Sequence, residues 1–301
     1  MDAPRKVDAR NGVKVITSNS FITAKGLEAL SLKARKMLYI AISQCRKDDD
    51  GFYSYEISVQ DFAALMDITP EAVYAEADSI TSELMSGVLC VAPEGEKYFT
   101  KYSLFNKCEY KHDGVLRFNL NNDMTNFLLQ LKKDFTQPLL EDFLKMQSPY
   151  SMAIWHLMQR EMHSKKPGVT NTIEFDLTVD ELREVTGTQE KLKQLGQFKE
   201  RCFDKALQEI NENCGVKITY ENIKKGRTVV GFHCSAVSVY HIDEDKMPQK
   251  VKDRARLGAL RVAQKNRELT DEEQEEYDSL MASTEQIELR FFQRRSSRAR
   301  K

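Results

Sequence analysis

The alternation of apolar and polar positions after Thr178 predicts a short helix, a turn and a longer helix. Thr178 precedes apolar residues at helical spacing and has Glu181 three positions later, the pattern of an N-cap with its capping box. Gly187 predicts the end of that helix. A second helix is expected over residues 189–213, and its apolar residues recur at steps of three and four: Phe198, Cys202, Phe203, Ala206, Leu207 and Ile210.

Two β-rich runs follow this second helix and predict a hairpin. Gly215 ends the helix, and the runs cover residues 216–220 and 227–234. The cations of the expected hairpin gather at its tip, as Lys224, Lys225 and Arg227. A short helix, a turn, a longer helix and a hairpin in this order indicate a winged helix, a DNA-binding form of the helix-turn-helix.

The exposed face of the second helix holds the candidate base-reading side chains. Steps of about 100° per residue place four of them opposite the apolar stripe: Lys193, Gln194, Gln197 and Arg201. Such side chains bond guanine and adenine edges. The same projection puts Lys199 on the apolar side, and Gly196 can break the segment so that the helix starts at Gln197.

The hairpin tip is the second candidate contact. Lys224, Lys225 and Arg227 would lie on phosphates or in a minor groove beside the groove that holds the helix. A solvated turn is the alternative reading of these three cations.

The same order of elements occurs earlier in the chain. A helix over residues 30–44, with Lys33, Arg35 and Lys36 facing water, precedes a strand over residues 52–57. Ser58 then caps a short helix, and a longer helix runs from Pro70 to residue 86. Gly87 ends it, and β-runs follow over residues 88–92, 98–110 and 115–120. In the second copy, a leading helix starts near residue 139 and a strand covers residues 172–177.

The repeat predicts an α+β fold of two tandem winged-helix domains. The expected divisions are an N-terminal arm (1–25), a first domain (26–135), a second, main DNA-reading domain (136–242) and a charged, partly helical mobile tail (243–301). A helix over residues 122–132 is expected to connect the domains.

The two copies differ in the charge of the longer helix. In the first copy it carries Glu71, Glu76, Asp78 and Glu83, a surface that phosphates would repel. The first domain is therefore expected to bind DNA through other groups, or to serve as a protein interface. The candidates are lysines of its strands, Lys97 and Lys101 with Lys107 and Lys111, and the alternative is that these are solvated surface lysines.

Composition restricts the class of protein. At 301 residues with a formal net charge of -1, the chain has room for two domains but lacks the overall basic charge of many nucleic-acid binders. Its six cysteines form no C-x-x-C pair, which indicates a reduced intracellular protein with buried thiols rather than a zinc site. Without an apolar run of about 18 residues, we expect a soluble, cytoplasmic protein that has no membrane partner.

No catalytic pattern emerges. The phosphate-binding loop G-x-x-x-x-G-K-[ST] is missing, and the five histidines lack metal-ligand spacing. His156 and His163 share a helix face, but a pair two turns apart more often serves packing than ligation. We expect no enzyme, no cofactor and no metal.

Several stretches together resemble the initiator Rep proteins of theta-replicating plasmids. They are residues 15–24 (VITSNSFITA), 30–35 (LSLKAR), 198–201 (FKER), 206–211 (ALQEIN) and 225–232 (KGRTVVGF). The resemblance covers roughly residues 13–240 and implies a non-enzymatic initiator that binds directly repeated origin sites, called iterons, bends and opens the origin, and recruits a host helicase and a DnaA-type initiator. It also implies dimers, joined through the first domain, that repress their own promoter.

Within this resemblance, six residues match the DNA-contacting positions: Gln197, Lys199 and Arg201 at the helix start, and Lys224, Lys225 and Arg227 at the hairpin tip. Two other functions remain open. One is a winged-helix transcriptional repressor without an initiator role, and the other is a winged-helix scaffold for protein interactions.

Overall fold

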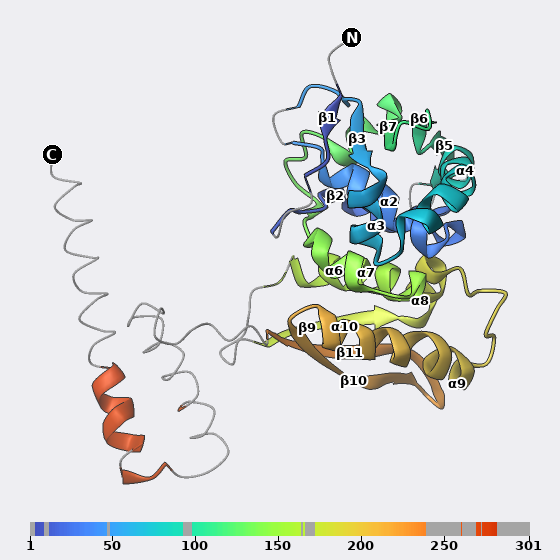
Figure 1. Cartoon of the computed structure of the whole chain (residues 1–301). Coiled ribbons are helices and arrows are strands. Elements are labelled where there is room, and N and C mark those ends of the chain that lie inside the picture. Colours follow the sequence, from blue (N-terminus) through green and yellow to red (C-terminus); the bar gives the residue numbers. More distant parts are fainter. Residues whose placement is uncertain are drawn as a thin grey trace, which may run out of the picture. The chain divides into compact units, whose positions relative to one another are not determined.

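The computed structural model describes residues 4–8, 12–46, 49–92, 98–163, 165, 172–238, 260, 269–271 and 273–281 (Figure 1). The chain divides into two units, residues 1–165 with 174–235 and residues 166–173 with 236–301. The second unit includes a helix over residues 273–281. At its start, the backbone N–H of Thr270 donates to the Glu273 carboxylate, and the backbone N–H of Glu273 donates to the Thr270 hydroxyl. Of the predicted charged tail (243–301), only residues 260, 269–271 and 273–281 are described.

The first winged helix is built on a sheet with the strand order β1-β3-β7-β6. Alternate residues of β7 (Leu116, Phe118 and Leu120) are buried, as expected for a strand with one face on the core. Helix α4 packs against α3, α2 and β6. The elements are β1 (Arg5–Lys6), α2 (Leu32–Ser43), β3 (Tyr55–Ser58), α3 (Val59–Met66), α4 (Pro70–Ser86), β6 (Phe105–Tyr110) and β7 (Val115–Leu120).

Short elements complete this part of the chain. Strands β4 and β5 pair as a separate antiparallel hairpin between α4 and β6. The predicted connector helix over residues 122–132 is wrong in length, because helical structure ends at Leu128. The short elements are β2 (Thr17–Ser18), α1 (Asn19–Ile22), η1 (Leu27–Ala29), β4 (Val88–Val91), β5 (Thr100–Ser103), η2 (Asn122–Met124), α5 (Thr125–Leu128) and β8 (Phe135–Thr136).

The second winged helix has a three-stranded sheet in the order β10-β11-β9. Helix α7 packs against α8, α10 and the segment between α9 and α10. The elements are α6 (Leu140–Lys145), α7 (Pro149–His163), β9 (Thr172–Thr178), α8 (Val179–Thr186), α9 (Leu195–Phe198), the π-helical segment η3 (Lys199–Phe203), α10 (Asp204–Asn213), β10 (Val216–Lys225) and β11 (Thr228–Ser238).

The internal repeat is confirmed in detail. The order β3-β7-β6 of the first sheet corresponds to β9-β11-β10 of the second. The Ser58 hydroxyl accepts a hydrogen bond from the Asp61 backbone N–H at 2.9 Å, as the Thr178 hydroxyl does from Glu181 at 3.1 Å. Both short helices then end at a left-handed residue, Asp67 or Gly187. By this correspondence the β4–β5 hairpin is an addition of the first copy.

The prediction that Arg35 and Lys36 face water is wrong. Their exposures are 3% and 2%, and both side chains donate to distant backbone carbonyls. Arg35 bonds the carbonyls of Leu27 and Pro149, and Lys36 Nζ lies 2.7 Å from the Leu144 carbonyl. The α6–α7 region covers this face of α2, which the local sequence of α2 does not reveal.

The two histidines singled out by sequence have packing roles. His156 is buried on α7, with its ring nitrogens 3.0 Å from the Thr17 hydroxyl and 2.9 Å from the Tyr39 hydroxyl. Burial lowers the pKa of His156 to about 3, so the ring is neutral. The His163 ring packs against Phe135.

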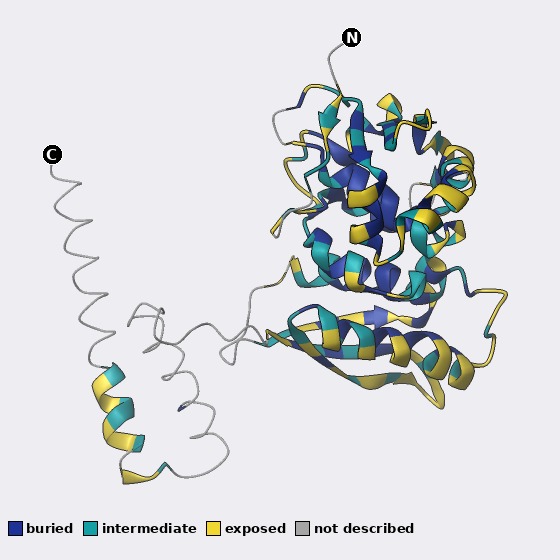
Figure 2. Cartoon of the chain, in the orientation of Figure 1, coloured by how far each residue is buried: buried dark blue, intermediate teal, exposed yellow. Residues whose placement is uncertain are grey.

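Figure 2 shows the buried residues gathered along α2 and α7.

Four of the six free cysteines have buried thiols, whereas Cys90 and Cys108 are half-buried. In the described ranges, no helix combines the length and the apolar character needed to cross a membrane.

Candidate nucleic-acid interface

The second domain places its longer helix later in the sequence than predicted. Helix α9 begins at Leu195 with Gln194 as its N-cap, so the expected start at Gln189 is wrong. Residues 187–194 form the turn, in which Leu192 has a left-handed φ of 49°. Lys193 and Gln194 therefore precede the helix, and both are exposed. Gly196 lies within the first helical turn and does not break it.

A π-helical segment interrupts the recognition helix, which consists of α9, η3 and α10. The N–H of Asp204 bonds the carbonyl of Lys199, five residues back, so this turn holds one more residue than an α-helical turn. Gln197 and Arg201 are exposed, whereas the residues that follow them, Phe198 and Cys202, are buried. The π turn was not predicted, because the apolar spacing fits a continuous α-helix.

Lys199 joins the recognition helix to the hairpin. Its Nζ lies 3.3 Å from Asn222 Oδ1, 4.9 Å from the centre of the Tyr220 ring and 5.6 Å from that of Phe232. The side chain is half-buried, as its projection to the apolar side indicated. Its ammonium is therefore engaged with the hairpin, unlike the exposed guanidinium of Arg201.

The hairpin is longer than predicted, and its tip is basic. Strand β10 extends to Lys225, and the turn consists of Gly226, with a φ of 63°, and Arg227. Lys224, Lys225 and Arg227 are exposed, and no ion pair involves them among the described residues. The Lys199 contacts hold the stem of this hairpin against the recognition helix. The recognition helix therefore lies beside the stem of the hairpin.

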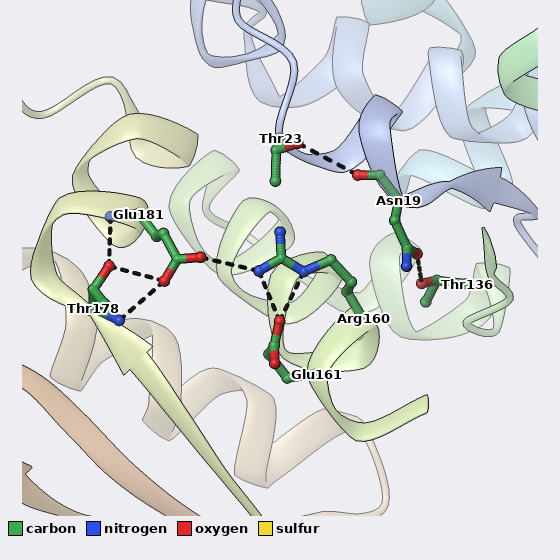
Figure 3. A network of polar contacts seen from close by, with 7 residues as sticks. All are labelled: Asn19, Thr23, Thr136, Arg160, Glu161, Thr178 and Glu181. Atoms are coloured by element: carbon green, nitrogen blue, oxygen red, sulfur yellow. Dashed lines mark hydrogen bonds and ion pairs between the residues drawn. The ribbon is translucent and has the colours of Figure 1, made fainter. Parts of the chain in front are cut away.

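The turn before the recognition helix is held by a residue that sequence analysis missed. Arg183, near the end of α8, donates hydrogen bonds to four turn carbonyls, those of Thr188, Lys191, Leu192 and Lys193. At the other end of α8, Arg160 from α7 bonds Glu181 of the capping box and its own neighbour Glu161 (Figure 3). An arginine therefore braces each end of α8. Only tertiary structure shows these partners.

One candidate lysine of the first domain, Lys101, lies on its added hairpin. Lys101 is exposed on β5, with its Nζ 5.3 Å from the centre of the Phe99 ring. Lys97 lies outside the described residues. By sheet order, the counterpart of the β10–β11 hairpin is β6–β7, so Lys101 does not occupy the position of the second-domain wing.

Lys107 and Lys111 are compensated by an acid. Their Nζ atoms lie 2.6 and 3.1 Å from the Glu109 carboxylate, and these hydrogen bonds lower the pKa of Glu109. This carboxylate therefore offsets one of the two lysine charges.

Two acidic residues of α4 form contacts within the first domain. Glu76 pairs with Lys33, and Glu83 accepts hydrogen bonds from the hydroxyl and backbone N–H of Ser31. These contacts join α4 to the start of α2. Glu71 and Asp78 remain exposed on the helix.

Comparison with known families decides what this pair of domains is. The model of the initiator replication protein WH1 domain matches residues 14–159, and that of the initiator Rep protein WH2 domain matches residues 178–234. The chain belongs to the initiator replication protein family. Members of this family are DNA-binding initiators of plasmid replication and not enzymes, so this chain is a plasmid replication initiator with two winged-helix domains.

The fold of this initiator is also found in a solved structure. A crystal structure of the Pi initiator protein in complex with iteron DNA has 20% sequence identity and a TM-score of 0.65, covering 76% of this chain and 98% of that chain. A crystal structure of domain 2 and domain 3 of RctB shares 10% identity at a TM-score of 0.38, over 70% of this chain and 81% of that chain. The first similarity supports the two-domain fold.

Proposed function

We propose that this initiator binds directly repeated origin sites through the surface formed by its recognition helix and the β10–β11 hairpin. The observation that carries the proposal is that Gln197 and Arg201 are exposed at the helix start, together with a basic hairpin tip that forms no ion pair with any described residue. The Pi initiator, which shares the fold, was crystallised with iteron DNA, and this supports the same class of site here. Lys193 and Gln194, in the turn before the helix, extend the surface.

The side chains of this surface fall into two groups by their chemistry, one for phosphates and one for base edges. Lys224, Lys225 and Arg227 bind phosphates and set the register, whereas Gln197 and Arg201 hydrogen-bond base edges. Bending across several repeats strains a neighbouring A·T-rich segment and assists its melting. Recruitment of a host helicase and a DnaA-type initiator to the opened origin completes this proposed role in the cytoplasm.

A footprinting titration of the protein on DNA upstream of its own gene, at two salt concentrations, tests the proposal. Protection of several direct repeats, with an affinity that falls steeply with salt, is the expected result. Protection of one inverted repeat alone would favour a transcriptional repressor. No protection at any site would reject DNA recognition and favour the protein-interaction scaffold.

The first domain offers a surface for the proposed dimer. Tyr98 and Phe99 are 61% and 60% exposed beside β5, and Val88 on β4 is 38% exposed. Among the described strands, β5 pairs only with β4, so its other edge has no strand partner there, although Asn121 Nδ2 donates to the Ser103 carbonyl. An exposed apolar group at an open strand edge favours self-association, and such a dimer is the proposed repressor of the initiator's own promoter.

A further inference from the structure

Arg183 makes an unusual set of contacts with the turn that precedes the recognition helix. Its Nη1 lies 3.1 and 3.4 Å from the carbonyl oxygens of Thr188 and Lys191, and its Nη2 lies 3.1 Å from each of those of Leu192 and Lys193. The guanidinium carbon is 4.7 Å from the centre of the Phe198 ring, in the first turn of the helix. One side chain thus joins α8, the turn and α9.

The turn needs such a brace. Residues 187–194 exceed the three or four residues that usually connect the helices of a helix-turn-helix. Leu192 adopts a left-handed conformation, which is unfavourable for a residue other than glycine. A planar guanidinium with five donors can bond several carbonyls at once, whereas a lysine ammonium cannot reproduce that fork. Arg183 therefore stabilises one conformation among those available to the turn.

The turn also carries candidate DNA contacts. Lys193 and Gln194 are its last residues, and the backbone position of Gln194 sets where α9 begins. The Lys193 side chain is 70% exposed, with an exposed ion pair to Glu190 that contributes little energy. Phosphate contacts by mobile lysines tolerate small displacements of the backbone, but base-edge hydrogen bonds need a fixed geometry.

We propose that Arg183 is a positioning residue for base reading, which presets the turn and the first turn of the recognition helix before DNA binds. Without it, DNA binding must order these residues, and this ordering opposes the binding. The loss falls on the cognate repeat rather than on DNA of random sequence, where phosphate contacts provide the affinity. This inference rests on the proposed function, because it assumes that the helix reads bases.

The test compares the full-length wild type with R183K, R183A and the control R160A. R160A also removes an arginine that braces α8, but Arg160 bonds Glu161 and Glu181 and makes no hydrogen bond to the turn (Figure 3). The dissociation constants for the cognate repeat and for random DNA are measured together with thermal stability. Hydrogen exchange of the backbone amides of residues 188–194 is measured in the free protein.

For R183K, which keeps the charge, we expect about tenfold weaker binding to the cognate repeat, equivalent to about 1.4 kcal/mol. In R183K, binding to random DNA should change less than about twofold, and hydrogen exchange in the turn should become faster. The control R160A should keep the wild-type ratio of the two affinities. An R183K protein with an unchanged ratio, while the wild type discriminates, would overturn the positioning role alone. A wild type that does not discriminate would overturn the proposed function and, with it, this inference. If R183A does not fold, R183K still gives either result.

Discussion

The ammonium of Lys199 and the ring of Tyr220 lie 4.9 Å apart, and this contact links the recognition helix to the hairpin. Replacing Lys199 by Met keeps the aliphatic stem but removes the cation. A partly exposed cation–π contact contributes about 0.5–1 kcal/mol, so we expect K199M to lower the free energy of unfolding by about that amount. Affinity for the cognate repeat should change less than it does in R201A. A loss of affinity equal to that of R201A would instead assign Lys199 a direct DNA contact.

Arg201 is expected to read a base. R201A should weaken binding to the cognate repeat by about 1–3 kcal/mol and leave binding to random DNA nearly unchanged. Competition assays with both DNAs measure this difference. The control is K133A, which removes a cation from the connector, where the side chain is 89% exposed. Equal losses on both DNAs would make Arg201 a phosphate contact only.

The hairpin tip should contribute charge without sequence preference. In a K224A/K225A/R227A variant, the slope of log K against log salt should become shallower by about 0.9 for each phosphate that the tip no longer neutralises. The affinity should fall equally on the cognate repeat and on random DNA, because phosphates carry no direct sequence information. Salt titrations of both DNAs test this, and an unchanged slope would show that the tip lies in solvent in the complex.

Phe99 should contribute to self-association. Because its ring is 60% exposed, F99S should leave the folded monomer stable while it shifts the protein from dimer to monomer. Sedimentation equilibrium at several concentrations measures the shift. V230S, at another exposed apolar residue, is the matched control. A dimer unaffected by F99S would exclude this hairpin, and a wild type that stays monomeric would exclude the dimer itself.

Asp142 should make stability depend on pH. Burial, and then the charge of Glu141, raise the pKa of Asp142 from 3.8 to about 7. The folded protein therefore holds this proton more tightly than the unfolded chain, so stability is lost as the pH rises from about 4 to about 7. D142N should stabilise the protein at pH 8 by an amount on the order of a few kcal/mol. This gain should disappear near pH 4.

Urea unfolding of D142N at both pH values measures this effect. D78N, at an exposed acid of α4, serves as the control and should change stability little at either pH. If D142N raised the free energy of unfolding equally at both pH values, the titration could not be assigned to Asp142.

Features of neighbouring residues were sufficient to predict the repeat. Contacts between residues far apart in the chain could not be predicted from the sequence. The hydroxyl caps at Ser58 and Thr178 and the stop at Gly187 depend on residues within a few positions, and the structure confirms them. The burial of Arg35 and Lys36 depends on carbonyls more than a hundred positions away, so α2 alone looked amphipathic.

The candidate DNA surface was predicted only in part. The apolar stripe of the recognition helix was predicted correctly, but its start at Leu195 depends on a turn that Arg183 closes. The π turn in η3 leaves every apolar residue at an acceptable spacing, and so it has no sequence signal. The individual DNA contacts remain predictions that binding measurements must test.

The extra residue of η3 has a consequence for how such initiators diverge. Deleting Glu200 would restore α-helical bonding and rotate the residues before it by about 100° relative to the core-packed α10. In the proposed complex, different side chains would then face the groove, although neither Gln197 nor Arg201 had been substituted. The deletion of a single codon would thus give an initiator that no longer binds the origin of the parent plasmid. Two related plasmids could then be maintained in one cell.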